Sequence, residues 1–133
     1  YCLYDIDDYY RDKICINFYK QLISFFDKNI LILIKEKRSN PNVSENYLNF
    51  SKKISQLDNV KFINNNISPY KLIYKSDLVI SIPFSSASIM AKYCKINSYY
   101  YDPSNMLNQN DSPFKIKILN KLNIKDILWD MIS

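Results

Sequence analysis

Residues 76–93 read SDLVISIPFSSASIMAKY, an apolar run that ends at a proline and is followed by serines and a second apolar stretch. Leu78–Ile82 has the length and composition of a buried strand, and Ser85–Tyr93 begins with serines and continues with helical spacing. Pro83 indicates a tight turn between them, because its ring fixes φ. The first main-chain N–H groups of a helix are unpaired and partly positive, so such a helix start binds phosphate without a basic side chain. The predicted phosphate-binding residues are Pro83, Phe84, Ser85, Ser86 and Ala87.

The same alternation of strand-length apolar runs and amphipathic stretches extends over the rest of the chain. The predicted strands are Tyr1–Tyr4, Ile30–Ile34, Val60–Ile63, Leu78–Ile82 and Ser98–Tyr101. The predicted helices are Tyr10–Asp27, Ser44–Leu57, Ser68–Tyr74, Ser85–Tyr93, Phe114–Leu122 and a short tail helix, Asp126–Ile132. Ser104–Ser112 is expected to be a mobile surface loop. Strict alternation predicts the α/β class: a Rossmann-like parallel sheet of about five strands with helices on both faces.

Length and composition indicate one soluble globular unit, residues 1–133. Hydrophobic residues make up 47% of the chain and charged ones 23%, which is typical of a folded domain with a real core. No apolar run approaches the roughly 18 residues of a membrane span. Three widely spaced cysteines argue against a disulfide framework and favour the cytoplasm. The lysines behind the net charge of +5 are scattered, so nucleic acid is not an expected partner.

Two residue types are missing, and each absence excludes known chemistry. Without glycine, neither a Walker-type phosphate loop nor the GxGxxG dinucleotide turn is available. Without histidine, a Ser-His-Asp triad and a histidine-ligated zinc are excluded. Any reaction must use carboxylates, lysine or the substrate itself, and we expect no metal and no cofactor.

Polar residues follow the predicted strands at their carboxyl ends, where ligands bind in α/β sheets. The basic segment Lys35, Lys37, Arg38 is a candidate anion-binding site, and Arg38 suits a planar anion best. Asp5, Asp7 and Asp102 are further cleft candidates, with Asp102 placed for ribose or acceptor contacts. Simpler explanations stand beside these: Ser85 as a helix cap, the basic segment as a solvated strand end, and the aspartates as partners of a helix dipole.

The run Asp77–Ser86, together with Tyr100–Pro103, resembles bacterial surface-polysaccharide glycosyltransferases known by a Pro-Phe-Thr-Ser motif. Here Ser85 replaces the threonine of that motif, and Lys35–Arg38 resembles the family's Lys-Pro-Lys-Arg segment with Glu36 in place of proline. The resemblance implies the C-terminal, nucleotide-sugar-binding half of a two-domain GT-B enzyme for capsule or O-antigen. Paired hydroxyl residues at such a turn are also similar to those of CMP-sugar transferases, which implies a CMP-linked acidic sugar as donor.

The resemblance leaves the catalytic residues unknown and assigns the acceptor to a missing N-terminal domain. The chain begins at Tyr1 and not at methionine, so we expect a fragment of a longer protein that binds donor without turnover. The protein is expected in the cytoplasm, with peripheral attachment of the full-length protein to the inner face of the membrane an open option. Two alternatives remain: a non-catalytic receiver-like α/β module, because acidic residues follow the first predicted strand, and a nucleotide-sugar epimerase half-domain.

Overall fold

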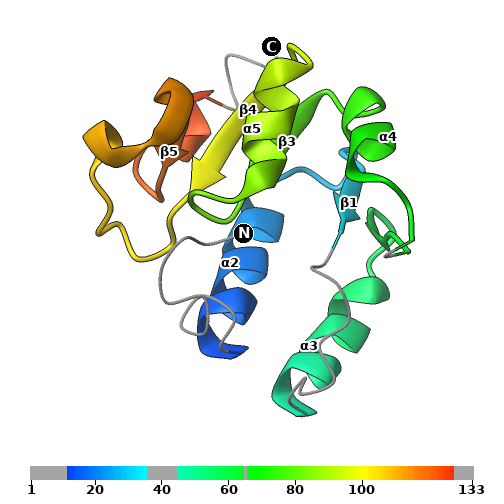
Figure 1. The fold of residues 1–133 in the computed structure, drawn as a ribbon. Coiled ribbons are helices and arrows are strands. Elements are labelled where there is room, and N and C mark those ends of the chain that lie inside the picture. Colours follow the sequence, from blue (N-terminus) through cyan, green and yellow to red (C-terminus); the bar gives the residue numbers. More distant parts are fainter. Residues whose placement is uncertain (1–11, 36–44, 65, 128–133) are drawn as a thin grey trace.

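The computed structural model describes residues 12–35, 45–64 and 66–127. Helices and parallel strands alternate along this part of the chain (Figure 1). The elements in order are α2 (Asp12–Phe25), β1 (Ile32–Ile34), α3 (Glu45–Ser55), β2 (Val60–Phe62), α4 (Pro69–Tyr74), β3 (Leu78–Ser81), α5 (Ser86–Tyr93), β4 (Asn97–Tyr101), the 3-10 turns η1 (Gln109–Asp111) and η2 (Pro113–Lys115), and β5 (Lys117–Leu119).

The strands form two small parallel sheets, which corrects the expectation of one sheet of about five strands. β1 pairs with β2, with Ile32 opposite Val60. In the second sheet β4 lies between β3 and β5. Within the described residues no strand pairing joins the two sheets. The predicted strand Tyr1–Tyr4 lies outside the described residues. The α/β class and the parallel pairing are confirmed.

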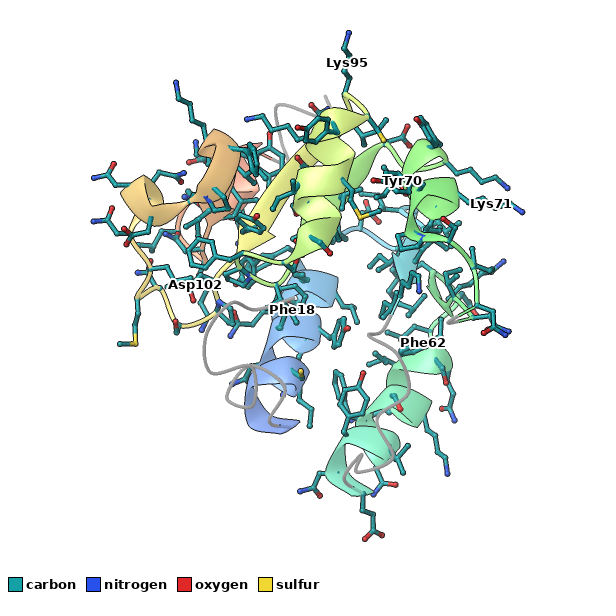
Figure 2. All side chains as sticks on the ribbon, in the orientation of Figure 1. Phe18, Phe62, Tyr70, Lys71, Lys95 and Asp102 are labelled. Carbon is teal, nitrogen blue, oxygen red and sulfur yellow. The ribbon has the colours of Figure 1, made fainter. Side chains whose placement is uncertain are left out.

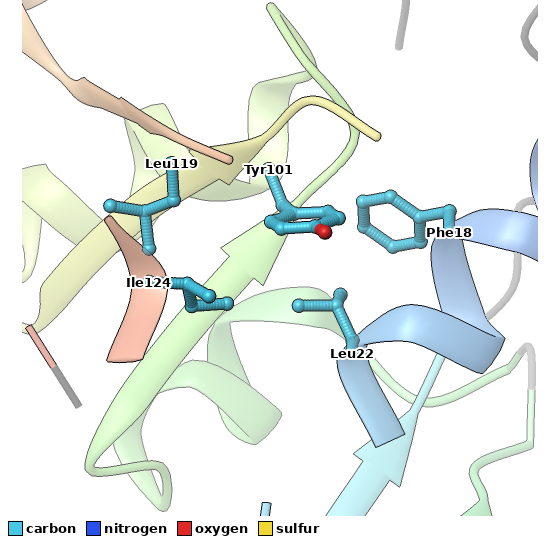
Figure 3. Close-up of a cluster of buried hydrophobic side chains, with 5 residues drawn as sticks. All are labelled: Phe18, Leu22, Tyr101, Leu119 and Ile124. Carbon is cyan, nitrogen blue, oxygen red and sulfur yellow. The ribbon is translucent and has the colours of Figure 1, made fainter. Parts of the chain in front are cut away.

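The three-stranded sheet has a helix on each face. Tyr100 in β4 packs with Phe84, Ile116 and Ile118 on the side of α5. The next residue, Tyr101, points to the opposite side, where it meets Phe18 and Leu22 of α2 (Figure 3). This alternation follows from the two-residue period of a strand. The expected placement of helices on both faces is therefore confirmed for this sheet.

α2 also packs against the second sheet. Its Tyr19 and Ile23 lie against a cluster formed by Ile34, Ile54 and Val60 from β1, α3 and β2. Each fully buried aliphatic side chain of this kind contributes about 1.5–3 kcal/mol. One helix thus contributes to both cores and holds the two sheets together.

The last strand corrects a second expectation. Phe114–Leu122 was expected to be a helix, but Phe114 and Lys115 have positive φ values of 55° and 59°, and β5 follows them. Ile116 and Ile118 are buried while Lys117 between them is exposed. That two-residue period belongs to a strand, and it fits β5 at the edge of the sheet. The chain becomes helical again at 124–127, and the rest of the predicted tail helix lies outside the described residues.

No helix within the described ranges is long and apolar enough to cross a membrane.

Candidate functional site

The turn between β3 and α5 forms without glycine because a main-chain hydrogen bond and a buried aromatic ring stabilise it. Phe84 adopts a left-handed φ of 64°, a conformation that costs a residue with a side chain about 1–3 kcal/mol. The Ser85 N–H donates to the Ile82 carbonyl at 3.1 Å and closes the turn. The Phe84 ring is 6% exposed and meets the Tyr100 ring edge-on, with centroids 5.7 Å apart. Burial of that ring offsets the backbone strain.

The start of α5 keeps its main-chain donors available. Ser85 is the N-cap residue, with φ −77° and ψ 159°, and its side chain makes no capping hydrogen bond. The hydroxyl therefore does not play the capping role that would explain the serine most simply. Within the part of the chain that the structure describes, the N–H groups of Ser86 and Ala87 have no hydrogen-bond partner. Ser86 is exposed and Ala87 is half-buried, so the positive end of this helix faces outward.

The Ser85 hydroxyl is a buried polar group without a partner. Serine 85 is 5% exposed, and its Oγ makes no hydrogen bond within the described ranges. Burying a hydroxyl in this state costs about 1–3 kcal/mol. Since nearly all buried polar groups in folded proteins are paired, this one marks the turn as locally frustrated.

Hydrogen bonds beneath the turn fix α5 to the sheet. Ser88 Oγ donates to the Tyr99 carbonyl at 2.8 Å and lies 2.5 Å from Ser81 Oγ. Because Ser88 has a single hydroxyl proton, Ser81 is the donor to Ser88. The Tyr100 hydroxyl donates to the Ser85 carbonyl at 3.4 Å, and burial raises the pKa of Tyr100 to about 12, so the phenol stays protonated at neutral pH.

Sequence reasoning missed these supports. Ser81 is a polar residue inside an apolar strand, and Ser88 lies one helical turn after Ser85. A polar residue in the strand and a serine on the same face of the helix as Ser85 were the features from which this hydrogen bonding could have been predicted.

Asp102 follows β4 and anchors the loop after it. Its carboxylate is 2% exposed and accepts hydrogen bonds from Ser104 N and Oγ, Met106 N and Leu107 N, at 2.5–3.0 Å. The loop 104–112, expected to be mobile, is therefore tied to the end of β4. A ribose or acceptor contact of Asp102 stays a prediction.

Two cavities adjoin this loop and not the turn. One, of about 300 Å³, is lined by Asp102, Asn105, Lys117, Asn120, Asn123 and three neighbours. The other, of about 470 Å³, lies against Gln109, Asn110, Ser112, Lys115 and Lys117. Residues 83–87 line neither of these two cavities, and Ser86 at the start of α5 is exposed.

Of the predicted site residues, the structure brings together the turn and Asp102, which follow neighbouring strands paired through Ser81 and Tyr100. Lys35 is half-buried and follows β1 in the other sheet. Lys37, Arg38, Asp5 and Asp7 lie outside the described residues. Among the described side chains, no group of three or more histidine, cysteine, aspartate or glutamate residues could hold a metal ion.

The parallel strands and the helix on each face of the larger sheet define an α/β protein. In proteins of this class, ligands bind at the carboxyl ends of the strands. A family model described as "Polysaccharide biosynthesis PFTS motif protein" matches residues 3–126. The chain belongs to this family and is a polysaccharide biosynthesis protein. Within the matched residues, Pro83–Ser86 in the turn described above reads PFSS, which differs from the PFTS of the family's description only at Ser85. No curated protein and no solved structure matches the chain.

Proposed function

We propose that this chain is the nucleotide-sugar-binding domain of a glycosyltransferase that makes surface polysaccharide. In this proposal the donor phosphate binds at the start of α5. The observation that carries it is the pair of unpartnered N–H groups at Ser86 and Ala87 beside the unpartnered Ser85 hydroxyl. A phosphate placed there accepts from both amides and is further stabilised by the helix dipole.

The three donors differ in access. Ser86 is exposed, whereas the Ser85 Oγ has less than 1 Å² of accessible surface. The amides therefore bind the phosphate first, and the Ser85 hydroxyl joins by rotating about χ1. This rotation gives a buried donor the partner that it lacks, so binding relieves part of the cost of its burial.

The open position of the turn fits a two-domain enzyme. Ser86 is exposed, so a phosphate bound at its N–H faces solvent in this domain alone. Ligand sites normally bury most of the ligand surface and lie preferentially between domains. We infer that a second domain closes over the turn and carries the acceptor site and the catalytic base. The donor is proposed to be a CMP-linked acidic sugar.

Isothermal titration of the 133-residue chain with CMP, UDP, GDP and pyrophosphate tests the proposal. Ser86→Pro is the informative variant, because proline removes one N–H yet suits the first position of a helix. The extended conformation of Ser85 accepts a following proline. Ser86→Ala is the matched control, since it removes the hydroxyl and keeps the N–H.

We expect CMP to bind, Ser86→Ala to bind within about threefold of the wild type, and Ser86→Pro to bind about 10- to 100-fold more weakly. That factor corresponds to one hydrogen bond to a charged group, about 1.5–3 kcal/mol. Absence of binding by all four ligands, or equal affinity of the two variants, would contradict the proposal.

A further inference from the structure

One end of the molecule carries four exposed aromatic side chains. Tyr70 and Tyr74 belong to α4 and are 50% and 68% exposed. Tyr93, the last residue of α5, is 78% exposed, and Phe114 in η2 is 58% exposed. We call these four residues the aromatic band. Single exposed apolar residues are common, but a contiguous cluster of large aromatic side chains on a protein surface marks an interaction site.

The band is continuous across three elements. Tyr74 lies near Cys94 and Tyr70, and the interaction with Cys94 raises the pKa of its hydroxyl. Tyr93 precedes Cys94 in the chain, and its ring meets Phe114 edge-on with centroids 6.4 Å apart. The Lys92 ammonium donates to the Phe114 carbonyl and ties η2 to the end of α5. The four rings therefore belong to one surface.

Lysines surround these rings, and the same segments hold no carboxylate. Residues 69–75, 92–95 and 113–115 contain no aspartate or glutamate, and the nearest acidic residues in the sequence are Asp77 and Asp111, each two residues outside these segments. Figure 2 shows Lys71 and Lys95 projecting away from the body of the molecule. All the lysines of these segments are exposed: Lys71, Lys75, Lys92, Lys95 and Lys115.

We propose that the aromatic band and its lysines form a docking surface for an anionic lipid bilayer. Tyrosine and phenylalanine side chains insert at the boundary between headgroups and acyl chains, and tyrosine keeps its hydroxyl in the polar layer. Lysines are attracted by anionic headgroups, at about fivefold in affinity for each lysine near the surface. A flat partner suits helix ends that protrude, whereas a glycan chain needs a groove. Of the residues of this surface, Lys115 lines the larger cavity, and none of the four rings lines either one.

The orientation that follows keeps the start of α5 away from the bilayer. Tyr93 and Lys92 lie at the end of α5, and the Pro83–Ala87 turn lies at its beginning. The helix has eight residues, so the two ends are about 12 Å apart. A bilayer on the band leaves the turn open to water-soluble ligands. The docking surface and the proposed phosphate site share no residue, so an experiment can contradict one proposal without contradicting the other.

Co-sedimentation of the 133-residue chain with phosphatidylglycerol–phosphatidylcholine vesicles tests the proposal, with pure phosphatidylcholine vesicles as reference. The charge variant is Lys71→Gln/Lys75→Gln/Lys95→Gln. Its control is Lys20→Gln/Lys52→Gln/Lys61→Gln, which removes the same charge from exposed positions elsewhere.

The ring variant is Tyr74→Ser/Tyr93→Ser. Its control is Met106→Ser/Leu122→Ser, which removes two side chains that are 83% and 80% exposed outside the band. Thermal unfolding of each variant checks that the fold is kept. We expect it to be kept because all the replaced side chains are exposed.

We expect binding to the anionic vesicles at 0.1 M NaCl, strong weakening at 0.5 M NaCl, and a loss of about 100-fold in the triple lysine variant of the band. The ring variant is expected to lose at least tenfold, and both controls to stay within about threefold of the wild type. Equal loss in the band variants and their controls overturns the proposal. Binding of dextran sulfate, a soluble polyanion, by a chain that does not bind the vesicles would also overturn the proposal.

Discussion

Replacing Asp102 by asparagine is expected to loosen the loop after β4 and destabilise the whole domain. The carboxylate is 2% exposed, and its Oδ2 accepts from the Met106 and Leu107 amides, each at 2.9 Å. In the variant, an amide nitrogen replaces one oxygen. If that nitrogen takes the place of Oδ2, the two part-buried amide donors of Met106 and Leu107 face a third donor.

The size of the effect follows from those two lost bonds. A hydrogen bond to a charged group contributes about 1.5–3 kcal/mol, and the remaining bonds to Oδ1 lose their charge assistance. Partial relaxation of the loop recovers some of this energy. We therefore expect the free energy of unfolding to fall by about 3 kcal/mol, out of the 5–15 kcal/mol that is typical of a domain.

Urea denaturation followed by circular dichroism measures the change, and limited proteolysis of the loop 104–112 reports where it acts. Asp111→Asn is the control, because it makes the same charge change at an exposed position of the same loop and should cost less than about 0.5 kcal/mol. Equal stability of the two variants would refute the anchoring role of Asp102.

Three further predictions concern the turn and the edge of the sheet. Ser85→Ala removes the unpartnered buried hydroxyl and is expected to raise stability by about 1 kcal/mol in thermal unfolding; a loss of similar size would show that the hydroxyl has a partner. Burial raises the pKa of Tyr100 to about 12 against 10.0 for the ordinary group, so the folded state keeps a proton that the unfolded chain releases. Stability should therefore fall by about 1.4 kcal/mol per pH unit between pH 10 and 12 on account of this residue, and an unchanged slope in Tyr100→Phe would contradict that. Gln109→Ala removes two hydrogen bonds to the exposed edge of β5, to Ile116 O at 3.0 Å and from Ile118 N at 2.8 Å, and is expected to cost about 1–3 kcal/mol in urea denaturation; no change would mean that water replaces the side chain.

The sequence was sufficient to predict those elements whose structure depends on local residue preferences. The apolar run at Leu78–Ile82 and the serines after Pro83 gave β3 and the start of α5 within one residue. Pro69 at the first position of α4 followed from its fixed φ and missing N–H. The structure also answers a question that the sequence left open, since Ser85 does not cap the helix with its side chain.

Structure that depends on contacts between distant segments could not be predicted from the sequence. The proline at position 113 favoured a helix start, yet Ile116 and Ile118 are buried because β4 pairs beside them. The break between the two sheets likewise depends on pairing between distant segments. Asp102 with Ser104 two residues later is a typical turn signal, but its bonds to Met106 and Leu107 depend on the path of the loop.

Amide chemical shifts of the chain during a titration with CMP test the central claim most directly. If the donor phosphate binds to the main-chain N–H groups at the start of α5, the amide protons of Ser86 and Ala87 move downfield and saturate with one shared affinity. Unchanged resonances at these two residues, while CMP perturbs amides elsewhere, would contradict the account.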